Sequence, residues 1–76
     1  MEIFPGISVD PEVRFGKPCL AGTRVDVATV VADVACGESF LAVQEAYELP
    51  REQVVAALRY AAHLAAQQRP PGAVSG

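Results

Sequence analysis

The feature that most constrains this chain is the run from Arg14 to Val27, which reads RFGKPCLAGTRVDV. Two glycines and a proline interrupt its apolar residues, and both residue types favour turns. A small helical bundle does not require so turn-rich a segment before its first helix. The run therefore predicts an ordered loop that leads into a helix, rather than a plain linker.

Chain length limits the fold to one domain, because 76 residues can form only one. A domain of this size buries only about 60–65% of its unfolded surface, so a second copy or another partner would add stability. No apolar run is long enough to span a membrane, and the N-terminus lacks the basic region of a signal peptide. We therefore expect a cytoplasmic protein in which residues 1–68 form the domain and residues 69–76, rich in Pro and Gly, form a flexible tail.

Residues 1–25 predict a short β-ribbon. Residues 3–9 alternate as a strand does, and residues 13–15 can form a second extended piece. Turns are expected at Gly16 and at Gly22. A two-stranded ribbon of this kind is too small to be stable unless it packs on helices or on a partner.

Three helices are predicted after the ribbon, at residues 27–36, 40–47 and 50–67. Asp26 and Ser39 are good N-caps for the first two, since each offers a side-chain oxygen to the free amides of the first turn. Gly37 ends the first helix, and Pro50 suits the first position of the third. The predicted fold is therefore mainly α, a three-helix bundle with an N-terminal β-ribbon.

Apolar residues recur at helical spacing in all three helices and predict a shared core. The inward stripes are Val27, Val30, Val31 and Val34 in the first helix, Phe40, Val43 and Tyr47 in the second, and Val54, Val55, Leu58, Ala61, Ala62 and Ala65 in the third. Cys36 is expected to be a small buried residue near a helix end, and Cys19 and Cys36 are both expected to be reduced.

Only Glu48 and Leu49 separate the second and third predicted helices, which is the layout of a helix-turn-helix. The final helix of such a unit enters the DNA major groove. Arg51, Gln53 and Arg59 are the candidates for DNA contact, because Arg pairs with guanine and Gln with adenine. The same residue types are also common on the solvated first turn of a helix that only packs.

Charge is unevenly distributed along the chain. The net charge of −3 argues against nucleic acid as a partner. Residues 1–49, however, carry three basic and eight acidic residues, whereas residues 50–76 carry three basic residues against Glu52 alone. The last third is therefore the locally positive part of the chain.

Catalytic and metal-binding patterns are absent from the sequence. One histidine, His63, and two cysteines fall short of the four ligands of a zinc site. No Gly-rich phosphate loop or nucleophile elbow is present. We expect no enzymatic activity, no metal and no cofactor.

The run Gly16-Lys17-Pro18, followed by Gly22-Thr23-Arg24 before the first helix, resembles a small bacterial family, Domain of Unknown Function 433. Pro50 and the alanine pattern of the third helix add to a resemblance that extends over residues 7–62. It implies a homeodomain-like helix-turn-helix that forms homodimers. It also implies the antitoxin of a type II toxin-antitoxin module, which neutralises a PIN-like nuclease toxin and represses their shared promoter DNA.

Lys17, Gly22, Thr23 and Arg24 are the candidate partner-binding residues of the loop. Lys17 and Arg24 can meet phosphate, a partner's carboxylate or acidic residues of this chain. The alternative function is a dimeric protein-interaction adaptor that does not bind DNA. An acidic chain suits that role, because a nuclease partner would be basic.

Overall fold

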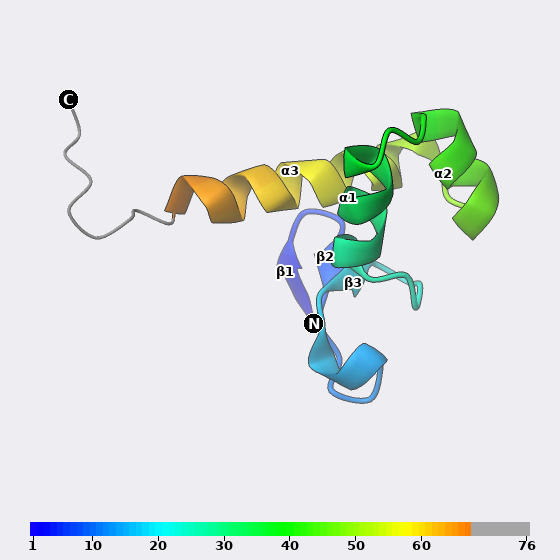
Figure 1. Cartoon of the computed structure of the whole chain (residues 1–76). Coiled ribbons are helices and arrows are strands. Elements are labelled where there is room, and N and C mark those ends of the chain that lie inside the picture. The colour runs from blue at the N-terminus through cyan, green and yellow to red at the C-terminus, as the bar shows by residue number, and fades with distance from the viewer. Residues whose placement is uncertain (68–76) are drawn as a thin grey trace, which may run out of the picture.

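The structure is a computed structural model that describes residues 1–67, and it is mainly α-helical with a small antiparallel sheet (Figure 1). The helices are α1 (Val27–Ala35), α2 (Phe40–Tyr47) and α3 (Arg51–Gln67). α1 and α2 both pack against α3, which also contacts the sheet. None of the described helices is long and apolar enough to cross a membrane. The predicted flexible tail, residues 69–76, lies outside the described residues.

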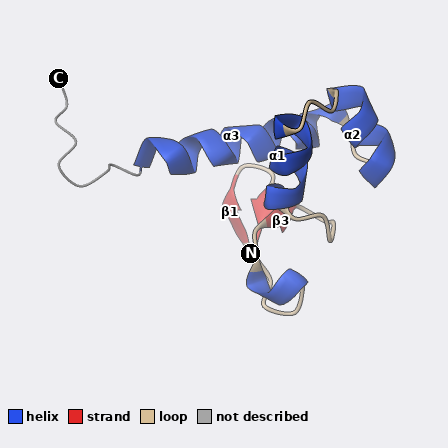
Figure 2. Ribbon diagram, in the orientation of Figure 1, coloured by secondary structure: helices blue, strands red, loops and turns tan. Residues whose placement is uncertain are grey.

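The sheet has three strands rather than the predicted two (Figure 2). They are β1 (Glu2–Phe4), β2 (Ile7–Ser8) and β3 (Cys19–Leu20), in the order β1-β2-β3. Gly6, with a φ of 82°, allows the tight turn that divides the expected first strand into a hairpin. Ile7 then pairs with Leu20. The predicted β element before the first helix is confirmed, but the number of its strands was wrong, because strand pairing depends on contacts between residues far apart in the chain, which periodicity does not reveal.

The hairpin turn lies directly on α3. A Cβ atom added at Gly6 would stand 3.0 Å from the Cβ of Ala56, so two small residues allow the turn to approach the helix closely. This contact holds β1 and β2 beside the N-terminal half of α3 and forms one wall of the groove described below.

A hydrophobic core joins the sheet to the three helices. Its buried residues are Ile7, Leu20, Val27, Val30, Val43, Leu49, Val54, Ala57 and Tyr60. The predicted stripes of the first two helices are confirmed, since Val30 and Val43 are fully buried and Phe40 and Tyr47 pack against the core.

The inward face of α3 differs from the prediction. Val54, Ala57 and Tyr60 are its buried residues, whereas Ala62 and Ala65 of the predicted stripe are exposed. Phe4 of β1 contacts His63, and Ala61 lines a groove beside α1, so the neighbouring elements still reach this part of α3. The exposed alanines lie on the sides of the helix that α1 and β1 leave uncovered. Helical spacing identifies an apolar stripe but does not show which side of it the neighbouring elements cover. The last turn of α3 extends away from the sheet (Figure 1).

Local signals at the helix ends are confirmed for the most part. The side chains of Asp26 and Ser39 each accept a hydrogen bond from a backbone amide of the first turn. Gly37 follows α1 with a φ of 98°, as a helix-ending glycine does. Cys36, the C-cap of α1, is exposed and not buried as predicted, because the last turn of α1 has solvent on that side.

A short turn connects α2 to α3. Glu48 ends α2 in the left-handed conformation, with a φ of 55°, and Leu49 is buried in the core. α3 begins at Arg51, one residue later than predicted, and Pro50 stands just before it. The Pro50 carbonyl accepts from the amide of Gln53 at 3.0 Å, so the proline still contributes to the first turn.

Candidate functional site

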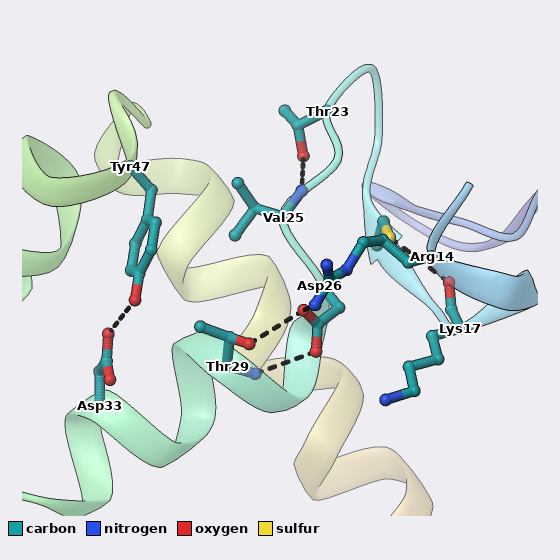
Figure 3. Close-up of polar contacts among 9 residues, drawn as sticks. Arg14, Lys17, Thr23, Val25, Asp26, Thr29, Asp33 and Tyr47 are labelled. Carbon is teal, nitrogen blue, oxygen red and sulfur yellow. Dashed lines mark hydrogen bonds and ion pairs between the residues drawn. The ribbon is translucent and has the colours of Figure 1, made fainter.

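Asp26 is the centre of the polar contacts in the loop (Figure 3). It is only 5% exposed, and its carboxylate accepts from the amide of Thr29 at 3.3 Å and from the Thr29 hydroxyl at 2.9 Å. Arg14 lies 3.3 Å from the same carboxylate. Burial raises the pKa of Asp26, but the Thr29 hydrogen bonds and the Arg14 charge outweigh it and hold the pKa below its usual 3.8. The carboxylate therefore joins the start of α1 to the preceding loop.

Gly22 and Thr23 shape the second turn of the loop. Gly22 has a φ of 78°, which favours glycine, so the expected turn is confirmed. The Thr23 hydroxyl donates to the Leu20 carbonyl at 2.9 Å. It also accepts from the Val25 amide at 3.1 Å (Figure 3). Because the Thr23 hydroxyl already bonds to two backbone groups, Gly22 and Thr23 stabilise the conformation of the loop rather than face a partner.

Lys17 and Arg24 are the exposed cations of the loop. Within residues 1–67 neither forms an ion pair, and the acidic partner in this region, Asp26, is taken by Arg14. In the described structure both cations are therefore exposed to solvent and make no ion pair with a carboxylate of this chain.

The segment just before this turn departs furthest from the prediction. Arg14, Phe15 and Gly16 form a 3₁₀ turn, η1 (Arg14–Gly16), instead of an extended piece, with φ values of 50°, 58° and 79°. A left-handed conformation costs a non-glycine residue about 1–2 kcal/mol. Hydrogen bonds from the Gly16 amide to Val13 and from the Lys17 amide to Arg14 close the turn. Phe15 is 97% exposed on it, and only the glycine hinted at a turn here.

The three candidate DNA-contacting residues are placed differently on α3. Gln53 is half-buried, and its side-chain amide donates to the Ala21 carbonyl at 2.9 Å, so it ties α3 to the loop. Arg51 and Arg59 are exposed. The Arg51 guanidinium also lies 4.8 Å from the centre of the Phe40 ring, which orients it by a cation–π contact.

Arg51 and Arg59 line one open groove of about 610 Å³ between α3 and the hairpin turn. Its other lining residues are Phe4, Pro5, Gly6, Glu52, Val55 and Ala56. The groove thus joins two of the three candidate residues, while Gln53 is turned toward the loop. A shallow groove with two guanidinium groups and one carboxylate suits binding to an extended anion better than chemistry on a small molecule.

The sequence matches the family described as "Protein of unknown function (DUF433)" over residues 7–61. The chain belongs to this family. All of the candidate residues of the loop and of α3, and also Phe15, lie inside the DUF433 match. Most of α3's exposed C-terminal end and strand β1 lie outside it.

A solved structure with a similar fold is the crystal structure of Rv2018 from Mycobacterium tuberculosis. The similarity covers 68% of this chain at 33% sequence identity, with a TM-score of 0.63. This chain matches only 24% of the length of that one, so the similarity is confined to a small part of the larger protein. No protein of curated function matches the sequence.

Cys19 lies in the loop before α1 and is buried. Its thiol donates to the Lys17 carbonyl at 3.4 Å (Figure 3). Burial and the nearby Asp26 charge raise the pKa of the thiol above its usual 9.0, although Arg14 opposes them. A raised pKa disfavours the reactive thiolate. In the described part of the chain, no three His, Cys, Asp or Glu side chains gather closely enough to hold a metal ion.

Proposed function

We propose that this chain is the antitoxin of a type II toxin-antitoxin module, a homodimer that binds a PIN-like nuclease toxin and its own promoter DNA. A homeodomain-like helix-turn-helix fits the three helices, because α1 packs on both α2 and α3 and only residues 48–50 separate the last two. The sole support for the toxin partnership is that the family to which this chain belongs resembles antitoxins.

The observation that carries the DNA role is the shared groove of Arg51 and Arg59. The two residues are eight positions apart, which corresponds to about 12 Å along a helix. The DNA major groove is also about 12 Å wide. Two exposed arginine side chains that leave the helix at positions so spaced suit contacts to phosphates on either side of the groove. Gln53 contributes through its hold on Ala21 rather than as the reader of a base.

Charge reversal of the arginine pair tests this role. We expect Arg51→Glu with Arg59→Glu to weaken binding to a labelled duplex of the chain's own promoter by about 100-fold, because two attractive phosphate contacts become repulsive. Fluorescence anisotropy at several salt concentrations gives both the affinity and its salt dependence.

Arg24→Glu is the matched control for Arg51→Glu alone, since each reverses one charge and Arg24 lies away from α3. It should leave promoter affinity within a few-fold of the unsubstituted chain. Equal losses in the control and in the α3 variant would show a general charge effect, and unchanged binding by the α3 variant would rule out this face.

Co-expression with the reading frame beside the gene tests the toxin partnership. We expect the neighbouring protein alone to stop growth, and this chain to restore growth and co-purify with it. Growth counts and a pull-down with a tag on this chain are the measurements. A harmless neighbour, or a rescue without a complex, contradicts the antitoxin role whatever the promoter result.

The second candidate function, a dimeric adaptor that does not bind DNA, is favoured by the fully exposed Phe15 and by the net charge of −3. The salt response distinguishes the two. Phosphate contacts give an affinity that falls steeply with ionic strength, whereas an adaptor shows no such duplex binding.

A further inference from the structure

Phe15 is an aromatic side chain held in solvent by a rigid turn. Its residue is 97% exposed, and η1 stands apart from the three helices (Figure 2). The backbone hydrogen bonds of η1 set the position of Phe15 in the free chain. A backbone that is already folded loses little conformational entropy on association, and aromatic side chains are common anchors of protein interfaces.

An apolar groove of about 390 Å³ opens between α1 and the C-terminal half of α3. Its lining is almost entirely apolar and includes Pro18, Val27, Val31, Ala61 and Leu64. Leu64 is 40% exposed at this groove, on the C-terminal half of α3. A groove of this size falls within the range of about 300–1,000 Å³ that accommodates a ligand side chain or small molecule.

The exposed ring and the groove lie close together in the chain. Lys17 and Pro18 line the groove and directly follow η1, yet Phe15 does not fill the groove of its own chain, since almost all of its surface is exposed. A surface that carries both a projecting side chain and a neighbouring apolar groove can bind a second copy of itself. Each copy then supplies one ring and one groove, and a two-fold axis closes the assembly.

The charged residues around η1 are also arranged so that two copies of the segment can complement each other. Asp10 and Glu12 precede the turn, Arg14 and Lys17 flank it, and all four are exposed. When two copies of such a segment run antiparallel across a two-fold axis, the acidic end of one faces the basic end of the other. This complementarity favours a second copy of the chain over an unrelated protein.

We propose that Phe15 of each protomer inserts into the α1–α3 groove of its partner and forms the homodimer interface. This inference rests on the homodimer of the proposed function, but it requires neither the toxin nor DNA. Burial of the two rings and of Leu64 covers the part of α3 that a single chain leaves open.

Sedimentation equilibrium of the full chain over a range of concentrations tests the interface. We expect Phe15→Ala to raise the dimer dissociation constant by about 100-fold, because each dimer loses two anchoring rings. Leu41→Ala is the matched control. It removes an apolar side chain that is 61% exposed on α2, away from η1 and the groove, and should leave the constant unchanged within a few-fold.

A cross-link identifies which surfaces meet. On a Cys36→Ser background, chains with Phe15→Cys and chains with Leu64→Cys, each with a different tag, are mixed at a concentration above the dissociation constant of the Phe15→Ala dimer and oxidised. We expect a disulfide that joins the two tags, and much less of one when Leu41→Cys replaces Leu64→Cys.

The outcomes separate the interface from the proposed function. A chain that is monomeric at every concentration removes the homodimer of the proposed function together with this interface. A dimer that Phe15→Ala leaves intact, with no mixed-tag disulfide, keeps the homodimer and overturns the interface. If the chain is monomeric and Phe15→Ala instead weakens a complex with the neighbouring protein, Phe15 belongs to that partner and the second-copy assignment is wrong.

Discussion

Leu20→Ala is expected to lower the free energy of unfolding by about 2–5 kcal/mol, because it removes buried methyl groups and leaves a cavity. Leu20 has no exposed surface and belongs to β3, where it pairs with Ile7 in the middle of the core. A domain of this length is stabilised by only about 4–11 kcal/mol in total. The variant should therefore lose a large share of its stability and unfold at a clearly lower urea concentration. Urea unfolding followed by circular dichroism, at one protein concentration, is the measurement.

Leu41→Ala is the control for this change. The substitution is chemically identical, but Leu41 is 61% exposed, so its effect should stay within about 0.5 kcal/mol. Equal losses for the two leucines would mean that β3 is not part of the core that stabilises the helices.

Asp26→Ala is expected to lower the free energy of unfolding by about 2–3 kcal/mol, since it removes a helix N-cap and leaves a half-buried hydroxyl on Thr29 without its partner. The contact with Arg14 adds little to this, because that side chain is half exposed and can turn to water. Ser39→Ala provides the comparison. Ser39 makes only the cap bond of α2, so its loss should be about 1 kcal/mol.

The same carboxylate predicts a pH dependence. Its pKa in the folded chain lies below the usual value, so its contribution is present above that usual value and is lost as the pH falls through the folded pKa. We expect the free energy of unfolding to fall below about pH 4, and less steeply in Asp26→Asn than in the unsubstituted chain. Identical slopes in the two proteins would show that other carboxylates govern the acid response.

The loop that makes the sequence distinctive is explained mainly by folding. Gly16 and Gly22 both adopt positive φ values, and the Thr23 hydroxyl closes the second turn. Gln53 of α3 then bonds to this loop across the chain. The loop residues that remain exposed, and so available to a partner, include Phe15 and Arg24.

Features set by near neighbours in the chain could be predicted from the sequence. The caps at Asp26 and Ser39, the glycine after α1 and the stripes of α1 and α2 depend on residues within one or two turns of a helix. For the same reason the helix bounds differ from the predicted ones by one residue at most. The placement of Arg51 and Arg59 on one exposed side of α3 also follows from helical spacing.

Only the tertiary structure decided which surfaces those elements cover. Pairing of Ile7 with Leu20 made a third strand, and the packing of α1 and the sheet on α3 left Ala62 and Ala65 on its solvent side. Contacts distant in the chain also directed Gln53 inward. The left-handed turn at Phe15 shows the same limit, because a strained backbone exists only where the surrounding bonds outweigh its cost. Local propensity determined the helices and their ends, while burial and long-range pairing determined the sheet, the core face of α3 and the residues left for a partner.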